Sequence, residues 1–187
     1  MIQKYTYGTP FETDAIVTSI PASEGTPAYG TISTENGFSF TYDMDDNDVV
    51  YGLGESNRGI NKRGYVYESN CSDQPNHTED KISLYGAHNF IVISGKQTFG
   101  LFVDYPGKLK FDIGYTLSSQ LKITCEDADL YLYVIEGETP YDIVKQFRKI
   151  IGRSYIPPKF AFGFGQSRWG YTTCLLYTSP SPRDYAA

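Results

Sequence analysis

The 187-residue sequence is poor in several residue types that mark specialised proteins, with three cysteines, two histidines, two methionines and one tryptophan. So few cysteines, and an odd number of them, exclude a disulfide-rich secreted scaffold and favour reduced thiols. No apolar run reaches the roughly 20 residues of a transmembrane helix, and the first residues lack the apolar core of a signal peptide. We therefore expect a cytoplasmic protein with no membrane partner.

An excess of positive charge is also missing. The chain has 22 acidic and 16 basic residues, which give a formal net charge of -6, and no basic stripe runs along it. This excludes nucleic acid as the expected partner. The acidic run at 43–48 lacks the turn glycine and the closing glutamate of a calcium loop, and a lone His77 in a polar stretch is weak support for a metal site. We expect neither a metal nor an organic cofactor.

Aromatic residues are plentiful: 17 tyrosines and 11 phenylalanines contribute to a hydrophobic share of 40%. This composition supports a sizeable core, and tyrosine suits the half-buried surface of a sheet. Short apolar or alternating runs recur about every ten residues with glycines between them, which is typical of an antiparallel β-sandwich. The expected strands lie at 38–42, 64–67, 90–93, 99–103, 109–113, 121–124 and 130–135.

One helix is well signalled after these strands. Thr139 is a suitable N-cap, Pro140 occupies the first helical position, and Asp142 occupies the capping-box position. Gly152 is expected to end the helix. The apolar face predicted to pack on the sandwich contains Ile143, Val144, Phe147, Ile150 and Ile151.

The segment after the helix predicts a change of architecture. Pro157 and Pro158 force an extended path. Residues 161–165 then read Ala-Phe-Gly-Phe-Gly, which is apolar on both faces of the pleat and predicts a strand buried inside a barrel. The polar and aromatic run from Gln166 to Tyr171 follows directly, where the active-site rim of a (β/α)8 barrel would lie.

The last residues, 174–187, match one reading frame of a common transposase sequencing adapter over eleven consecutive residues, Cys174 to Asp184. A native linker rich in serine and proline is the alternative. We interpret this tail as non-native and leave it out of the fold. The expected organisation is a β-sandwich at 1–156, a linker and first barrel strand at 157–173, and the tail at 174–187.

Several short motifs occur together in one order along the chain. They are Tyr51-Gly-Leu-Gly-Glu55, Asp73-Gln74-Pro75, Tyr141-Asp-Ile-Val144, Gly152-Arg153, Pro157-Pro158 and Gln166-Ser-Arg-Trp-Gly-Tyr171. With these motifs the sequence resembles glycoside hydrolase family 31. The resemblance implies a mainly β fold, in which a galactose-mutarotase-like antiparallel β-sandwich with one helix precedes the truncated start of a catalytic (β/α)8 barrel. It also predicts that Glu55 pairs with Lys62 or Arg63.

The same resemblance implies the activity of the longer parent protein, a retaining exo-α-glucosidase with two catalytic aspartates. Both aspartates would belong to later barrel strands, so no catalytic residue is expected within these 187 residues and the chain itself is expected to be inactive. The implied partner is an oligosaccharide with a terminal α-glucosyl or α-xylosyl residue, and the choice between them stays open. Whether the parent protein forms a homo-oligomer also stays open.

Three residues are candidates for substrate binding. Asp73 resembles a family carboxylate on a sandwich loop that reaches over the barrel mouth to a neighbouring sugar, although it could instead cap its own backbone in a solvated turn. Trp169 could stack on a sugar ring or only pack under a loop. Arg168 could contact sugar or pair with barrel carboxylates. A stand-alone carbohydrate-binding β-sandwich module without catalysis is the alternative function.

Overall fold

The computed structural model describes residues 1–165, and the chain divides into two units. The first unit, Met1–Arg153, contains ten strands and the only α-helix found in the described part of the chain. The second unit begins at Ser154.

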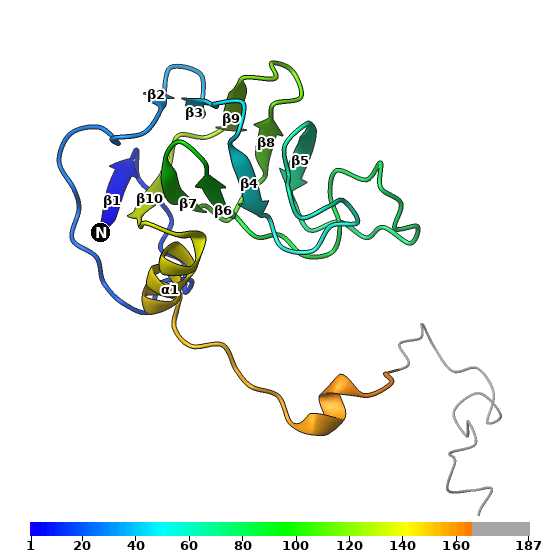
Figure 1. Ribbon diagram of the computed structural model, residues 1–187. Coiled ribbons are helices and arrows are strands. Elements are labelled where there is room, and N and C mark those ends of the chain that lie inside the picture. The colour runs from blue at the N-terminus through cyan, green and yellow to red at the C-terminus, as the bar shows by residue number, and fades with distance from the viewer. Residues whose placement is uncertain (166–187) are drawn as a thin grey trace, which may run out of the picture. The chain divides into compact units, whose positions relative to one another are not determined.

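The strands of the first unit form two antiparallel five-stranded sheets (Figure 1). The first sheet has the order β1 (Ile2–Tyr7), β10 (Leu130–Glu136), β7 (Thr98–Asp104), β6 (Phe90–Ser94) and β4 (Val49–Gly52). The second sheet has the order β2 (Thr31–Ser33), β3 (Phe38–Asp43), β9 (Gln120–Cys125), β8 (Leu109–Ile113) and β5 (Tyr65–Ser69). The predicted β-sandwich is confirmed, and all seven predicted strands are present. Strands β1, β2 and β4 were not predicted.

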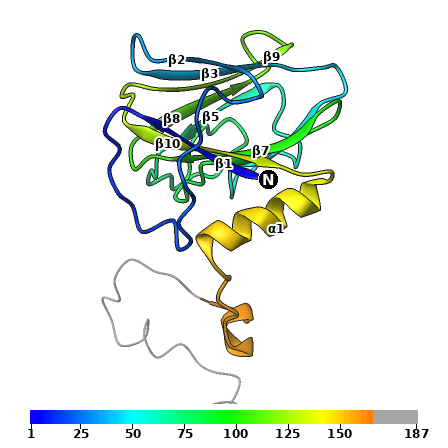
Figure 2. The same cartoon turned by 90° about the vertical axis from the view of Figure 1, so that its left-hand side faces the viewer.

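The two sheets differ in how many of their faces are covered. In β10, six of the seven residues are buried, because one face meets the second sheet and the other is covered by the α-helix. In β8, burial alternates, with Phe111 inside and Lys110 directed outward. Period-two burial is what a sheet with one solvated face requires. Figure 2 shows the two layers, with the helix beside the first sheet only.

The core between the sheets is built from large apolar side chains. Phe40, Phe99, Leu101, Phe111 and Ile123 have no exposed surface. A residue of this size gives about 1.5–3 kcal/mol on full burial, so these side chains dominate the stability of the sandwich.

The helix α1 (Pro140–Ile151) begins as predicted. Thr139 is the N-cap, its hydroxyl accepts from the backbone N–H of Asp142, and the Asp142 carboxylate accepts from the N–H of Thr139, which completes a capping box. Gly152 is the C-cap with a positive φ of 88°. The start and end of this helix are confirmed.

The predicted apolar face of α1 is correct only in part. Ile143 and Ile150 are buried, and the ring of Phe147 stacks on Phe90 with centroids 3.8 Å apart. Val144 and Ile151, at the border of the face, are 41% and 36% exposed. On the sheet below, a Cβ at Gly100 would lie 2.5 Å from Cγ2 of Ile143, so the close approach of the helix requires glycine there.

Residues between β1 and β2 provide hydrogen-bond donors for the C-terminal end of this helix. The backbone N–H of Val17 donates to the Ile150 carbonyl at 2.8 Å, and the Thr18 hydroxyl donates to the Lys149 carbonyl at 2.8 Å. The last carbonyls of a helix have no partner within the helix, so this segment satisfies two of them. The connection between β1 and β2 is thereby tied to the end of α1.

The described residues of the second unit, 154–165, do not contain the predicted barrel strand. Lys159–Phe162 form a short 3-10 helix, closed by bonds such as Ala161 N–H to the Pro158 carbonyl at 2.9 Å. Phe160, Phe162 and Phe164 are 82%, 74% and 96% exposed. A strand needs a neighbouring strand to satisfy its backbone, and the described residues provide none for this segment. The predicted strand at 161–165 is therefore not formed, and the described residues show no start of a barrel; the rest of the predicted segment, 166–173, lies outside them.

Candidate functional site

The candidate residue Asp73 lies on the long connection between β5 and β6, residues 70–89, which we call the Asp73 loop (Figure 1). The loop folds back on itself at its base. The N–H of Glu68 donates to the Ile82 carbonyl at 2.8 Å, and the N–H of Ser72 donates to the Leu84 carbonyl at 2.9 Å. These two bonds fix the positions of the outgoing limb, which contains Ser72 and Asp73, and of the returning limb, which contains Leu84 and Tyr85.

The Asp73 carboxylate is exposed and held by one side chain of the returning limb. The hydroxyl of Tyr85 donates to Oδ1 of Asp73 at 2.5 Å. The hydrogen bond to Asp73 raises the pKa of the Tyr85 hydroxyl, because it stabilises the protonated phenol. The ring of His77 meets the ring of Tyr85 edge-on, with centroids 5.5 Å apart. Three side chains of the loop therefore form one cluster.

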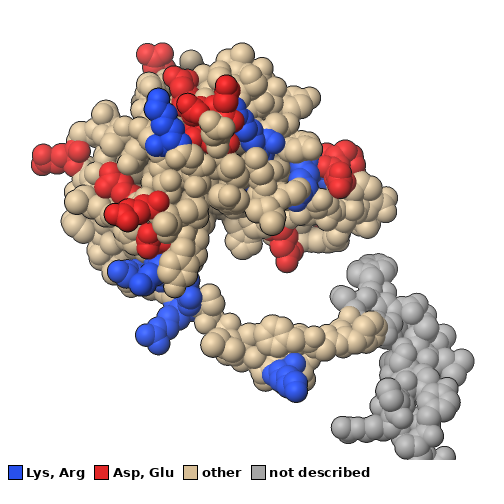
Figure 3. All heavy atoms as spheres, viewed as in Figure 1, with Lys and Arg blue, Asp and Glu red and all other residues tan. Residues whose placement is uncertain are grey.

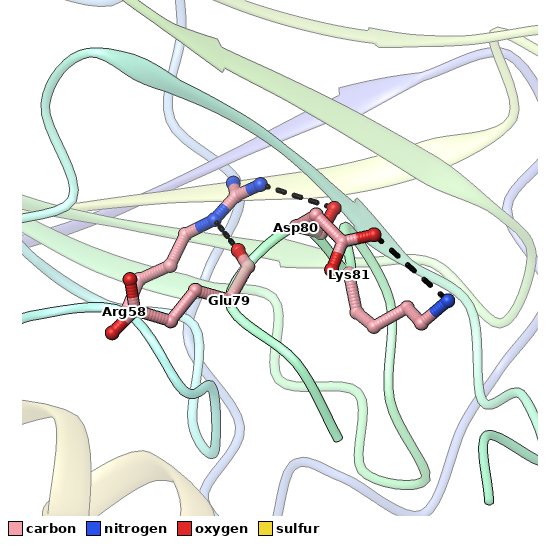
Figure 4. A network of polar contacts seen from close by, with 4 residues as sticks. All are labelled: Arg58, Glu79, Asp80 and Lys81. Carbon is pink, nitrogen blue, oxygen red and sulfur yellow. Dashed lines mark hydrogen bonds and ion pairs between the residues drawn. The ribbon is translucent and has the colours of Figure 1, made fainter. Parts of the chain in front are cut away.

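The far part of the loop, which contains His77, Glu79 and Asp80, is held by Arg58, a residue that lies before β5 (Figure 4). Its Nε donates to the Glu79 carbonyl at 2.7 Å, and its Nη2 donates to the Asp80 carbonyl at 3.4 Å. Its Nη1 donates to the Val66 carbonyl of β5 at 2.8 Å. A single guanidinium thus joins the loop to the sheet, because its fork of donors can reach several carbonyls at once.

The guanidinium of Arg58 is itself supported by aromatic rings. It lies 4.4 Å from the centroid of Tyr65 and 5.0 Å from that of Tyr67. The ion pair between Lys81 and Asp80, at 3.9 Å, is largely exposed and contributes little to the stability of the loop. Arg58 is therefore the main anchor of the far part of the loop.

The predicted pairing of Glu55 is wrong. Nζ of Lys62 donates to the Ser56 hydroxyl at 2.7 Å and to the Gly59 carbonyl at 3.1 Å. Arg63 donates to backbone carbonyls, including those of Asp45 at 2.7 Å and Ser118 at 2.9 Å. Both cations are used to satisfy turn carbonyls, and Glu55 remains exposed.

Two cavities lie near the Asp73 loop. The smaller, of about 20 Å³, is lined by residues that include Ser56, Tyr67 and His88. The larger, of about 550 Å³, lies between α1 and the first sheet and is lined by residues that include Phe102 and Asp104. Asp73 lines neither cavity, so the candidate site is an exposed carboxylate on a loop and not an enclosed pocket.

The Asp104 carboxylate in the larger cavity is nearly fully buried, and burial raises its pKa. It accepts a hydrogen bond from the Thr13 hydroxyl at 2.6 Å. Within residues 1–165 no group of three or more His, Cys, Asp or Glu side chains is placed to hold a metal ion. Among the helices of that part, none has the length and apolarity to cross a membrane. Figure 3 shows acidic and basic side chains interspersed over the face in view.

Of the three predicted substrate-binding residues, the structure places only Asp73. Arg168 and Trp169 lie outside the described residues. Sequence reasoning missed the contacts of Arg58 and Tyr85. Nothing in the sequence around Tyr85 or Arg58 marked either residue as a partner of the loop.

Comparison with known proteins identifies the region that contains this loop. The family model described as "Glycosyl hydrolase 31 N-terminal galactose mutarotase-like domain" matches residues 10–112. Alpha-glucosidase 2 of Bacillus thermoamyloliquefaciens is 32% identical over 149 residues, which cover 74% of this chain and 19% of the relative. An alpha-xylosidase of Lactiplantibacillus pentosus is 27% identical over 120 residues, which cover 64% of this chain and 15% of the relative.

Solved structures show the same architecture. A glycoside hydrolase 31 dextranase of Flavobacterium johnsoniae, solved as a mutant complexed with isomaltotriose, matches with a TM-score of 0.65 and 25% identity. The match covers 71% of this chain and 16% of the dextranase. The chain therefore spans less than a fifth of the length of each of these relatives.

Proposed function

The chain belongs to the glycoside hydrolase 31 N-terminal galactose mutarotase-like domain family, and from this premise we propose that it is the N-terminal sandwich of a retaining exo-α-glucosidase. The observation that carries the proposal is that the family match over residues 10–112 contains the whole Asp73 loop. The relatives named above include an α-glucosidase and an α-xylosidase, which supports a substrate with a terminal α-glucosyl or α-xylosyl residue.

In this proposal the hydrolysis itself is performed outside these 187 residues. A retaining glycosidase needs a nucleophile and an acid/base whose carboxyl groups stand about 5–5.5 Å apart. Asp73 has Tyr85 as its neighbour, an arrangement that provides a hydrogen-bond acceptor and not a second catalytic carboxyl. Its role is to accept hydrogen bonds from hydroxyls of the sugar next to the cleaved bond, for which an exposed carboxylate is suited.

A stand-alone carbohydrate-binding module is the second candidate. The support for it is that one structural relative, the dextranase, was solved in complex with glucose and with isomaltotriose. Under the preferred proposal the sandwich supplies one part of a site. One exposed carboxylate does not offset the entropy lost when a disaccharide is immobilised.

The purified 187-residue chain is expected to hydrolyse no aryl α-glucoside and to show no saturable binding of isomaltose at millimolar concentration. Release of nitrophenol and chemical-shift titration measure the two properties. The Asp73→Ala variant serves as the control for any weak shift changes. Saturable binding that Asp73→Ala abolishes would favour the module, and turnover clearly above background would contradict the proposed division of labour.

A further inference from the structure

We propose that Tyr85 is a positioning residue that holds the Asp73 carboxylate in a fixed orientation for a sugar hydroxyl. The inference rests on the proposed function of Asp73 and adds to it the residue that orders the carboxylate. It assigns Tyr85 no contact with the reacting atoms.

The first support is the geometry of the contact between the two limbs of the Asp73 loop. Tyr85 directly follows Leu84, whose carbonyl is bonded to the N–H of Ser72 next to Asp73. The backbone bond therefore brings the two side chains opposite each other, and the hydroxyl of Tyr85 reaches Oδ1 of Asp73 at 2.5 Å. A bond that links residues on both limbs fixes the direction in which the carboxylate points.

The second support is that Tyr85 is held from another side as well. The edge-on contact of its ring with His77 involves the far part of the loop. That part is anchored to β5 through the bonds of Arg58 to Glu79, Asp80 and Val66. Tyr85 is 53% exposed, so burial alone does not fix the ring, and these contacts are what order it.

The third support is the number of acceptor positions that remain on Asp73. An ionised carboxylate has about four lone-pair sites on its two oxygens. The tyrosine occupies one site on Oδ1 and donates its only proton, so Oδ2 remains for hydroxyls of the ligand. An exposed carboxylate that rotated freely would lose that freedom on binding sugar, whereas one already held by Tyr85 loses less. The tyrosine thus preorganises the site.

The contact is tested first by titration of Tyr85 in the 187-residue chain. Tyrosines labelled with ¹³C at Cζ are followed by NMR as the pH rises, and the Tyr85 signal is identified by its loss in Tyr85→Phe. In Asp73→Asn the pKa of Tyr85 should fall, because the carboxylate charge is gone while the side-chain shape is kept. His77, the other titratable group against the ring, is present in both chains. An unchanged Tyr85 pKa would overturn the inference.

The functional consequence is tested in the full-length enzyme with isomaltose and an aryl α-glucoside. Tyr85→Phe should lower kcat/KM for isomaltose by about threefold to tenfold, mainly through KM, and change aryl-glucoside turnover much less. Tyr115→Phe, an exposed tyrosine between β8 and β9, is the matched control. If Asp73→Ala weakens isomaltose turnover but Tyr85→Phe does not, the inference is wrong. If Asp73→Ala has no effect either, the proposed function of Asp73 fails first.

Discussion

Replacing Phe111 by alanine is expected to lower the free energy of unfolding of the chain by about 3–5 kcal/mol. Phe111 lies in the middle of β8, has no exposed surface, and belongs to the cluster that fills the space between the two sheets. Its neighbours in register are Tyr67 on β5 and Ile123 on β9, both buried. The removed ring leaves a cavity that two hydrogen-bonded strands cannot easily close, so the loss exceeds the transfer free energy of the ring alone.

The matched control for this change is on the same strand. Lys110 precedes Phe111, points to the solvated face of the second sheet, and is exposed. Lys110→Ala should change the free energy of unfolding by no more than about 0.5 kcal/mol. Urea unfolding followed by circular dichroism gives both values from the midpoint and slope. A loss below about 1 kcal/mol for Phe111→Ala, or equal losses for the two variants, would contradict the proposed core.

Replacing Asp73 by alanine in the full-length enzyme is expected to lower kcat/KM for isomaltose by about 10–200-fold, and to change aryl α-glucoside turnover much less. The physical reason is that the proposed partner hydroxyls belong to the second sugar, which an aryl glucoside lacks. The carboxylate is exposed and outside both nearby cavities, so its removal should not disturb the sandwich. Kinetics with the two substrates separate this effect from a general loss of activity.

The matched control for this change is Asp80, on the same loop. Asp80 is also an exposed carboxylate of the Asp73 loop, and its side chain pairs only with Lys81 among the ion pairs of the described residues. Asp80→Ala should leave the ratio of isomaltose to aryl-glucoside turnover unchanged. An equal change of this ratio in both variants would mean that turnover depends on the negative charge of the loop in general. Asp73 would then have no particular role.

The helix and the central strands could be predicted because their signals are local. The capping box of Thr139 and Asp142 and the C-cap at Gly152 lie within the segment they delimit. Strands such as β7 and β10 are buried on both faces and are therefore apolar along their central residues, 99–103 and 130–135. Composition and periodicity were sufficient for this part of the fold.

Three of the four edge strands, β1, β2 and β4, were missed because edge strands carry weaker patterns. β1 has a single buried residue, Tyr5, and β2 has only three residues. Their pairing with β10 and β3 depends on the rest of the sandwich. The segment at 161–165 failed for the opposite reason, since its apolar pattern is that of a buried strand but the described residues offer it no neighbouring strand.

Of the candidate site within the described residues, only Asp73 could be predicted from the sequence. Asp73 was found through the motif Asp73-Gln74-Pro75, which is a family resemblance and not a physical signal. The bond of Tyr85 to Asp73 and the bonds of Arg58 to Glu79 and Asp80 join residues that are 12 or more positions apart, and they exist only after the loop has closed. No periodicity or composition records such contacts.

The most direct measurement is the distance between Asp73 and sugar in a crystal structure of the full-length enzyme with bound isomaltose, trapped by removal of its catalytic nucleophile. We expect Oδ2 of Asp73 to lie about 2.5–3.0 Å from a hydroxyl oxygen of the second sugar, with the Tyr85 hydroxyl still donating to Oδ1. An ordered disaccharide whose hydroxyls lie beyond hydrogen-bond distance of Asp73, directly or through one water, would contradict it.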